Sequence, residues 1–281
     1  MQTVTLNNGI VMPMVGYGTM FEPEQTQEKV LEALEAGYRL IDTASAYKNE
    51  AEVGAAVRKS GIPREELFIT SKIWPQDFGY EKAKKWIEHT LEVMGLDYLD
   101  LYLIHQPYGD YYGAWRAMEE FYEAGKIRAL GISNFSPNRM LDLCVNVKVV
   151  PAVNQMEVHP FCQQKEATEF MKEFDIKLQA WGPFAEGQKD IFQSKVLAGI
   201  GEKYSKSIAQ VILRWHFQRG VITIPKSVHK ERMKENLDIF DFQLSEEDMT
   251  AIAAMDTGCG LAGDPNAPIL GKMMGTLKVH D

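Results

Sequence analysis

Short apolar runs alternate with amphipathic stretches along most of this 281-residue chain, and no other feature of the sequence limits the fold as much. Each run is a strand candidate because it is brief and dense in apolar side chains. The stretches between the runs favour helices; Tyr80–Met94, for example, repeats apolar residues from Ala83 to Met94 at helical spacing. The eight strand candidates are Met14–Gly18, Tyr38–Thr43, Leu67–Lys72, Tyr98–His105, Ile127–Ser133, Ala152–Met156, Lys177–Trp181 and Val221–Pro225.

Eight strand–helix units in a chain of this length predict an α/β fold, a closed (β/α)8 TIM barrel that forms one domain over residues 1–281. An open, doubly wound sheet stays an alternative on the pattern alone. We also expect two added helices. Lys195–Arg219 reads as two helices split near Ser205–Ser207. Ser245–Met255 reads as a further helix, with Asp248 at the distance of a capping box.

The two ends of the chain fall outside this pattern. The apolar segments around Asn8-Gly9 predict a short N-terminal β-hairpin with a type I′ turn that plugs one end of the barrel. The tail, Gly258–Asp281, lacks periodicity and is expected to be irregular. We expect it to fold over the barrel mouth, because its apolar residues should not stay in water. These residues are Leu261, Ile269, Leu270, Met273 and Met274.

Gly258–Gly263 matches the GxGxxG spacing of dinucleotide-binding loops. In a Rossmann unit this motif follows a strand and opens a helix. Here a predicted helix precedes the motif, Asp264-Pro265 follows it, and only 18 residues remain. We therefore reject the motif as a dinucleotide site.

Charge and cysteine content exclude several classes of function. A net charge of −9 argues against a nucleic-acid partner, which needs a basic surface. The three cysteines, Cys144, Cys162 and Cys259, lack metal-ligand spacing, so we expect no metal site and a reducing, cytoplasmic location. No signal peptide or membrane-length apolar run is evident, and we expect a monomer or at most a weak homodimer.

Ionisable residues stand at or just beyond the ends of three consecutive strand candidates, where a barrel gathers its catalytic groups. They are Asp42 and Tyr47, then Lys72, then His105. Any one of them could simply cap a helix or face solvent, but together they suit hydride transfer to a carbonyl, which builds negative charge on oxygen. We expect Lys72, held by Asp42, to make Tyr47 a stronger acid by lowering its pKa. His105 could orient the carbonyl oxygen.

At this point the sequence resembles the aldo-keto reductases over essentially its whole length. The matching stretches, in order, are Gly37–Ala44 with Tyr47, Asn49 and Glu50; Ser71–Trp74; Asp97–His105; Gly131–Phe135; Pro151–Gln155; and Ile224–Val228 with Arg232, Glu235 and Asn236. The resemblance implies an NADPH-dependent enzyme that reduces aldehydes or ketones to alcohols. It also implies a catalytic tetrad of Asp42, Tyr47, Lys72 and His105, with Tyr47 as general acid.

The resemblance assigns the cofactor-binding residues as well. It implies that Ser133, Asn134 and Gln155 hold the nicotinamide carboxamide, and that Trp181 stacks on the ring where many relatives have Tyr. Lys226, Ser227, Val228, Arg232, Glu235 and Asn236 would hold the far end of NADPH, with the cations on its 2′-phosphate and Glu235 and Asn236 at the adenine. A solvated helix face is the alternative for this last group.

Met20, Trp74 and Gln106 are the substrate-pocket candidates. Met20 and Gln106 stand where several relatives have Trp, and the loop after the fourth strand, Gln106–Asp110, is short. These features resemble the bacterial branch that includes 2,5-diketo-gluconic acid and glyoxal reductases, which implies a small or sugar-like carbonyl substrate. Two other functions stay open on the sequence: a non-catalytic, nucleotide-binding redox-sensor subunit and a phosphate-binding barrel isomerase.

Overall fold

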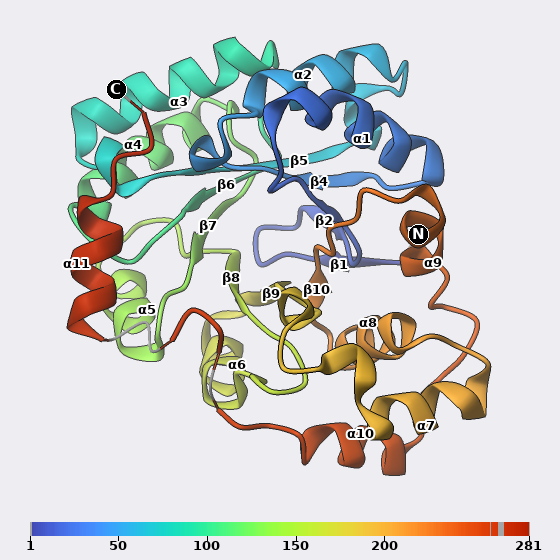
Figure 1. The fold of residues 1–281 in the computed structure, drawn as a ribbon. Coiled ribbons are helices and arrows are strands. Elements are labelled where there is room, and N and C mark those ends of the chain that lie inside the picture. Colours follow the sequence, from blue (N-terminus) through green and yellow to red (C-terminus); the bar gives the residue numbers. More distant parts are fainter. Residues whose placement is uncertain (1, 259, 264–266, 281) are drawn as a thin grey trace.

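The computed structural model describes residues 2–258, 260–263 and 267–280, and a ring of parallel strands lies at its centre (Figure 1). Eight strands pair side by side in chain order, from β3 to β10. Each predicted apolar run overlaps one of them, and β5 and β8 extend one residue beyond their predicted ends. The strands are β3 (Tyr17–Gly18), β4 (Leu40–Asp42), β5 (Phe68–Ile73), β6 (Leu101–Ile104), β7 (Leu130–Ser133), β8 (Val153–Glu157), β9 (Lys177–Trp181) and β10 (Ile222–Thr223).

A parallel bridge between Val15 and Thr223 joins the first strand to the last. The Gly16 amide donates to the Thr223 carbonyl at 2.7 Å, and the Thr223 amide donates to the Met14 carbonyl at 2.9 Å. The ring is therefore closed, which confirms the (β/α)8 barrel and excludes the open doubly wound sheet.

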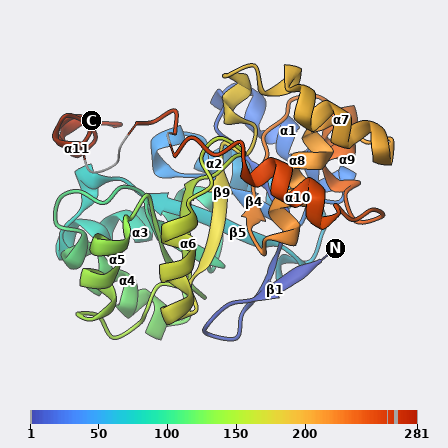
Figure 2. The same ribbon diagram turned by 90° about the horizontal axis from the view of Figure 1, so that it is seen from below.

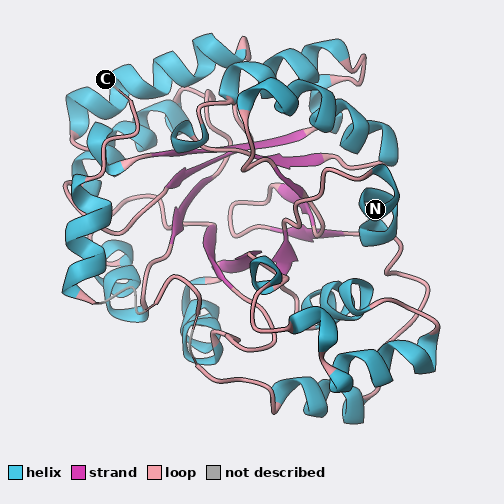
Figure 3. Cartoon of the chain, in the orientation of Figure 1, coloured by secondary structure: helices cyan, strands magenta, loops and turns pink. Residues whose placement is uncertain are grey.

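Helices surround the ring (Figure 3). They are α1 (Pro23–Ala36), α2 (Glu50–Lys59), α3 (Tyr80–Met94), α4 (Tyr111–Glu123), α5 (Pro137–Cys144), α6 (Lys165–Met171), α7 (Lys195–Tyr204), α8 (Ile208–Gln218), α9 (Lys230–Leu237), α10 (Glu246–Ala253) and α11 (Pro268–Thr276). The predicted split gives α7 and α8, and Ser245 caps α10 in a capping box with Asp248. None of the helices in the described ranges is long and apolar enough to cross a membrane.

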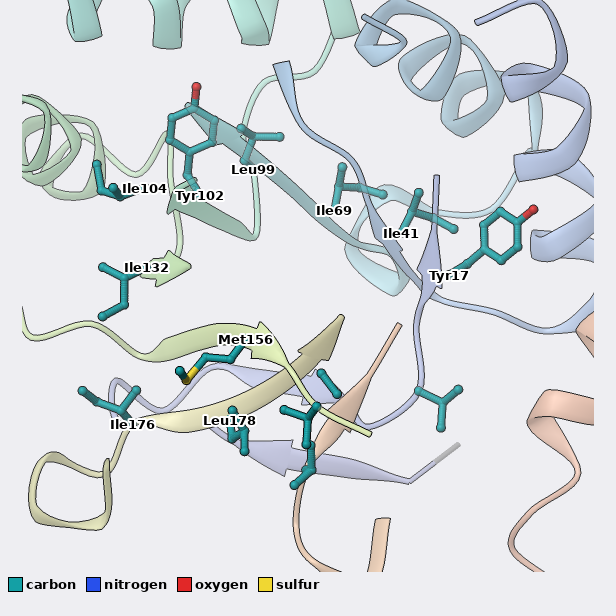
Figure 4. Packing of buried hydrophobic residues seen from close by; sticks show 14 of the residues in the cluster. Tyr17, Ile41, Ile69, Leu99, Tyr102, Ile104, Ile132, Met156, Ile176 and Leu178 are labelled. Carbon is teal, nitrogen blue, oxygen red and sulfur yellow. The ribbon is translucent and has the colours of Figure 1, made fainter. Parts of the chain in front are cut away.

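Alternation along the strands builds two apolar layers and also positions the polar groups. Leu40 and Phe68 belong to the cluster inside the barrel. Ile41 and Ile69 belong to the layer between the strands and the helices, part of which is shown in Figure 4. Because successive side chains on a strand point to opposite faces, Asp42 shares the inward face with Leu40.

The N-terminal hairpin pairs β1 (Thr3–Thr5) with β2 (Val11–Pro13) and closes the end of the barrel opposite the tail (Figure 2). Its Leu6 and Met12 join the cluster inside the barrel. The predicted type I′ turn is wrong. Gly9 has a φ of +85° and Asn8 has no positive φ, and the Gly9 amide donates to the Leu6 carbonyl, as in a three-residue loop with a glycine bulge.

The expectation of an irregular tail is also wrong in part, because α11 (Pro268–Thr276) lies within it. Proline at the start of this helix costs no hydrogen bond, since its first amides lack helical partners in any case. Ile269 is 80% exposed and Met273 is 53% exposed, contrary to our expectation. Leu261 does pack against the outer apolar layer.

Gly131 on β7 explains why one strand position excludes a side chain. A Cβ atom there would lie 2.4 Å from Leu103 Cδ2 and 2.9 Å from the Val153 carbonyl oxygen. We predict that Gly131→Ala lowers the free energy of unfolding by about 1–3 kcal/mol through overpacking. The control is Gly199→Ala on the exposed face of α7, where a Cβ meets no atom within 4 Å. Urea denaturation of both variants decides: equal stabilities would refute the packing argument.

Candidate active site

Lys72 of β5 and Asp42 of β4 form a fully buried ion pair inside the barrel. The Lys72 ammonium also donates to the Thr43 carbonyl at 2.8 Å, and Gln155 Nε2 donates to the second Asp42 oxygen at 2.8 Å. Burial alone would lower the pKa of Lys72, but the charge and hydrogen bond of Asp42, together with the influence of Tyr47, outweigh burial and raise that pKa. The lysine therefore stays charged in a site that water does not reach.

Tyr47 ends a short 3₁₀ turn, Ser45–Tyr47, which begins three residues after the end of β4. Asn49 fixes this turn: its Oδ1 accepts from Thr43 Oγ1 at 2.6 Å, and its Nδ2 donates to the Thr19 carbonyl at 2.7 Å. The Lys72 ammonium consequently lies 5.0 Å from the Tyr47 ring centroid, so its charge acts directly on the phenol.

The net pKa of Tyr47 differs from our expectation. Burial raises it, and the opposing effect of Lys72 is smaller. The expectation that the ammonium favours the phenolate is correct in sign but wrong about the outcome. The phenol thus keeps its proton at neutral pH.

His105 follows β6 and lies edge-on to two aromatic rings. Its ring centroid is 5.8 Å from that of Tyr47 and 5.0 Å from that of Trp74. Burial, with a smaller contribution from the Lys72 charge, holds the pKa of His105 well below its usual value. The imidazole is therefore neutral and can donate one hydrogen bond without adding charge.

The predicted carboxamide-binding residues lie together beside this cluster. The Ser133 hydroxyl and the backbone amide of Asn134 both donate to the backbone carbonyl of Gln155 at 2.9 Å. The Trp181 indole donates to Asn134 Oδ1 at 2.9 Å. Asn134 has a left-handed backbone, with φ of +63°, which asparagine tolerates better than most residues. These contacts hold the Trp181 indole and several amide groups at one edge of the barrel mouth.

A long groove crosses the mouth of the barrel. One part, of about 820 Å³, has Asp42, Tyr47 and His105 in its wall, together with the predicted pocket residues Met20, Trp74 and Gln106. A second part, of about 910 Å³, is lined by the whole predicted phosphate and adenine group, from Lys226 to Asn236. The two parts share lining residues, namely Phe21, Gly182, Glu186, Ile224 and Lys226, so they are continuous.

The groove therefore brings together nearly every predicted site residue. Lys72 alone lies behind the wall, fully buried. Ser133, Asn134, Gln155 and Trp181 line the first part of the groove. Its length, its amide-rich inner end and its cationic outer end fit an extended dinucleotide.

At the outer end of the groove, Arg232 and Asn236 share one face of α9 as their spacing predicted. Arg232 makes no ion pair within the described residues. Its neighbour Glu235 instead accepts a hydrogen bond from the Ser207 hydroxyl. The guanidinium is thus available to an anion, while Glu235 is tied to the start of α8.

Sequence reasoning missed several residues of the wall, and four of them illustrate why. Phe21 and Glu186 line both parts of the groove, and Leu277 and Val279 of the tail line the inner part. The Trp74 indole donates to the Leu277 carbonyl at 2.8 Å, which explains how the tail reaches the site. No local pattern signals these residues, since their positions depend on tertiary contacts.

Comparison with known proteins settles the family. The model of the Aldo/keto reductase family matches residues 12–257. The chain belongs to that family. It is 50% identical to the glyoxal reductase of Bacillus subtilis (strain 168) over 258 residues, which cover 90% of this chain and 92% of that protein.

Two solved aldo-keto reductase structures have the same fold as this chain. An aldo-keto reductase from a Medee basin deep-sea metagenome library superimposes with a TM-score of 0.92 at 41% identity, covering 94% of this chain and 98% of that one. The Bombyx mori aldo-keto reductase in complex with NADP superimposes with a TM-score of 0.87 at 33% identity, covering 92% and 93%. The protein is an oxidoreductase that reduces carbonyl groups with NADPH, and nothing favours the non-catalytic alternative.

No cluster of potential metal ligands occurs in the part of the chain that the structure describes.

The reductase contains an unusual carboxyl group next to the site. Glu50, at the start of α2, is buried and accepts from the Ser71 hydroxyl at 2.5 Å. Burial raises the pKa of Glu50 to about 7.

This shift makes stability depend on pH. Between the ordinary value of 4.5 and about 7, the folded protein holds a proton on Glu50 that the unfolded chain has lost. Wild-type stability should therefore fall as pH rises through this window, by up to about 1.4 kcal/mol per pH unit. Glu50→Gln should lack this fall, and Glu52→Gln on the same helix should keep it. Urea denaturation at pH 5 and pH 8 measures the difference, and parallel curves for all three proteins would contradict the prediction.

Proposed function

We propose that this enzyme reduces small dicarbonyl compounds, such as glyoxal and methylglyoxal, with Tyr47 as the proton donor. The observation that supports the proposal is the convergence of a protonated phenol, a buried ammonium–carboxylate pair and a neutral imidazole on one end of the groove. The 50% identity with a glyoxal reductase supports the substrate class. The polar Gln106 and the short loop after β6 suit a small, hydrophilic carbonyl compound.

NADPH, when bound, supplies the hydride. The residues of the chain then deal with the charge that develops on the carbonyl oxygen. The Tyr47 hydroxyl donates its proton to that oxygen. The Lys72 ammonium, which lies 5.0 Å from the Tyr47 ring centroid, stabilises the phenolate that remains. Asp42 keeps the ammonium in place, and His105 donates a hydrogen bond that orients the substrate carbonyl.

The groove residues would divide the cofactor between them. Ser133, Asn134 and Gln155 would hold the carboxamide, and Trp181 would stack on the ring. The other end would rest against the α9 group, where Val228 lies at the surface and Glu235 and Asn236 would face the adenine. Lys226, Ser227 and Arg232 would meet the 2′-phosphate and so favour NADPH over NADH.

Other expectations stay predictions at this stage. They are a single domain over residues 1–281, a monomeric state and a cytoplasmic location. The packing of Leu6 and Met12 of the N-terminal hairpin against the apolar cluster inside the barrel and the contact of Leu277 with Trp74 support the single domain. The surplus of acidic over basic residues is consistent with a partner that is a small molecule rather than a nucleic acid.

Tyr47→Phe should lower kcat for methylglyoxal by about 10²–10⁴-fold, because the proton donor is lost. Binding of NADPH, followed by fluorescence titration, should persist. Tyr112→Phe is the matched control, since the Tyr112 hydroxyl bonds to Asp142 at the exposed surface. A Tyr47→Phe enzyme that keeps near wild-type turnover would remove Tyr47 from the mechanism.

Arg232→Ala should weaken NADPH binding by roughly 10- to 100-fold and leave NADH binding nearly unchanged, since only NADPH carries the 2′-phosphate. The loss should shrink at high salt, which screens the attraction in the wild type. Lys234→Ala removes an exposed cation from the same helix and should change neither affinity. If both cofactors weaken equally in Arg232→Ala, the arginine supports its helix rather than the phosphate.

A further inference from the structure

The GxGxxG segment, which takes no part in the cofactor groove, binds a buried carboxylate of the same chain. Glu157 ends β8 and is 5% exposed. The Leu261 amide donates to its Oε1 at 2.5 Å, and the Ala262 amide donates to its Oε2 at 3.1 Å. Each oxygen of one side chain thus holds one backbone amide from the base of the tail, more than 100 residues away.

His159 completes the environment of this carboxylate. The ring is fully buried, and its Nε2 lies 2.9 Å from Glu157 Oε1. The Phe161 amide donates to Nδ1 at 3.2 Å, so Nδ1 carries no proton and Nε2 is the donor to Glu157. Burial alone would raise the pKa of Glu157, but the bonds from His159 and from the two tail amides lower it. The carboxylate is therefore ionised and receives three hydrogen bonds.

Gly260 allows the tail to approach this closely. A Cβ atom on Gly260 would lie 2.4 Å from Glu157 Oε2 and 2.8 Å from its Cδ. Neither atom can move away without breaking the bonds to the amides. Gly260, the second glycine of the motif, is thus needed for packing against Glu157 and not for binding a pyrophosphate. Cys259 lies outside the described residues.

The held segment forms part of the wall of a further cavity, of about 590 Å³, under the tail. Leu270 and Met274 of α11 line this cavity from the tail side, and Met156 lines it from the barrel side. Gln106, Asn134 and Trp181 line both this cavity and the inner part of the groove, so the two spaces adjoin at the site. A substrate longer than a small dicarbonyl would extend from the one into the other.

The far end of the tail is fixed separately. Gln76 Oε1 accepts from the Val279 amide at 2.9 Å, and His280 Nε2 lies 2.8 Å from Asp77 Oδ2. The His280 ring also stacks on Trp86, with centroids 4.0 Å apart. The tail is therefore attached at two places, and Glu157 supplies the attachment nearer to the barrel centre.

We propose that Glu157 is a specificity-determining positioning residue, which sets the tail wall of the substrate site by binding the Leu261 and Ala262 amides. The proposal rests on the carbonyl reductase function proposed above. Loss of the carboxylate should release the tail wall, so that bulky aldehydes lose their apolar contacts under the tail. Methylglyoxal, which is too small to reach that wall, should be affected little.

The first test measures the attachment of the tail to Glu157 and needs no activity assay. Hydrogen–deuterium exchange at the Leu261 and Ala262 amides should quicken by at least about tenfold in Glu157→Gln, since a hydrogen bond to a charged group is lost. Glu166→Gln is the matched control, because Glu166 is an exposed carboxyl that lines the same cavity. Unchanged exchange in Glu157→Gln would overturn the proposal.

The second test is kinetic. In Glu157→Gln the KM for 4-nitrobenzaldehyde should rise about tenfold, while kcat for methylglyoxal and the Kd for NADPH stay within about twofold. A fall in kcat for both substrates alike would point to a structural role only and would overturn the proposal. The proposal would also be overturned if the ratio of kcat/KM for methylglyoxal to kcat/KM for 4-nitrobenzaldehyde were the same in Glu157→Gln as in Glu166→Gln.

Gly260→Ala provides a second variant in case Glu157→Gln does not fold, because it displaces the tail and leaves Glu157 paired with His159. It should show the same exchange and the same selective rise in KM, and a wild-type profile would overturn the proposal. A wild-type enzyme that oxidises no NADPH with any carbonyl compound would instead refute the proposed function, and the exchange measurement would still report on the attachment.

Discussion

A charged lysine inside a barrel requires a partner, and the architecture around the site follows from that requirement. Lys72 is completely buried, so its charge would be lost or would destabilise the fold if Asp42 were absent. Asp42 in turn accepts from Gln155, and Gln155 donates to Gln179 at 2.9 Å. This polar network joins β4, β5, β8 and β9 across the interior, above the apolar residues that fill the rest of the barrel.

The network explains why the site is rigid before any ligand arrives. The ammonium cannot move without leaving its carboxylate, and the Tyr47 turn is tied to strand ends by Asn49. Catalytic groups placed in advance need no reorganisation when charge develops on a substrate oxygen. By contrast, the outer end of the groove presents the exposed cations Lys226 and Arg232, which suits the binding of a charged group from solvent.

Much of this arrangement could be predicted from the sequence, because it follows from local periodicity. The apolar runs predicted every strand of the barrel. Ser245, with Asp248 three residues later, predicted where α10 begins. The type of the hairpin turn could not be predicted, because Asn-Gly permits more than one loop length. The inclusion of Leu277 and Val279 in the site, and the net pKa of Tyr47, depend on burial that only the assembled fold creates. The helix in the tail has too weak an amphipathic pattern to stand out beside the eight strand–helix units.

The closure of the barrel sets an order on its formation. The seam joins Val15 to Thr223, and the strands on either side of it, β3 and β10, have two residues each. During synthesis the first strand emerges long before its second neighbour exists, so it must wait with one edge unpaired while some 200 residues are added. Among the strand pairings of the ring, the seam joins the two segments most distant in sequence, so its closure carries the largest loop-closure entropy.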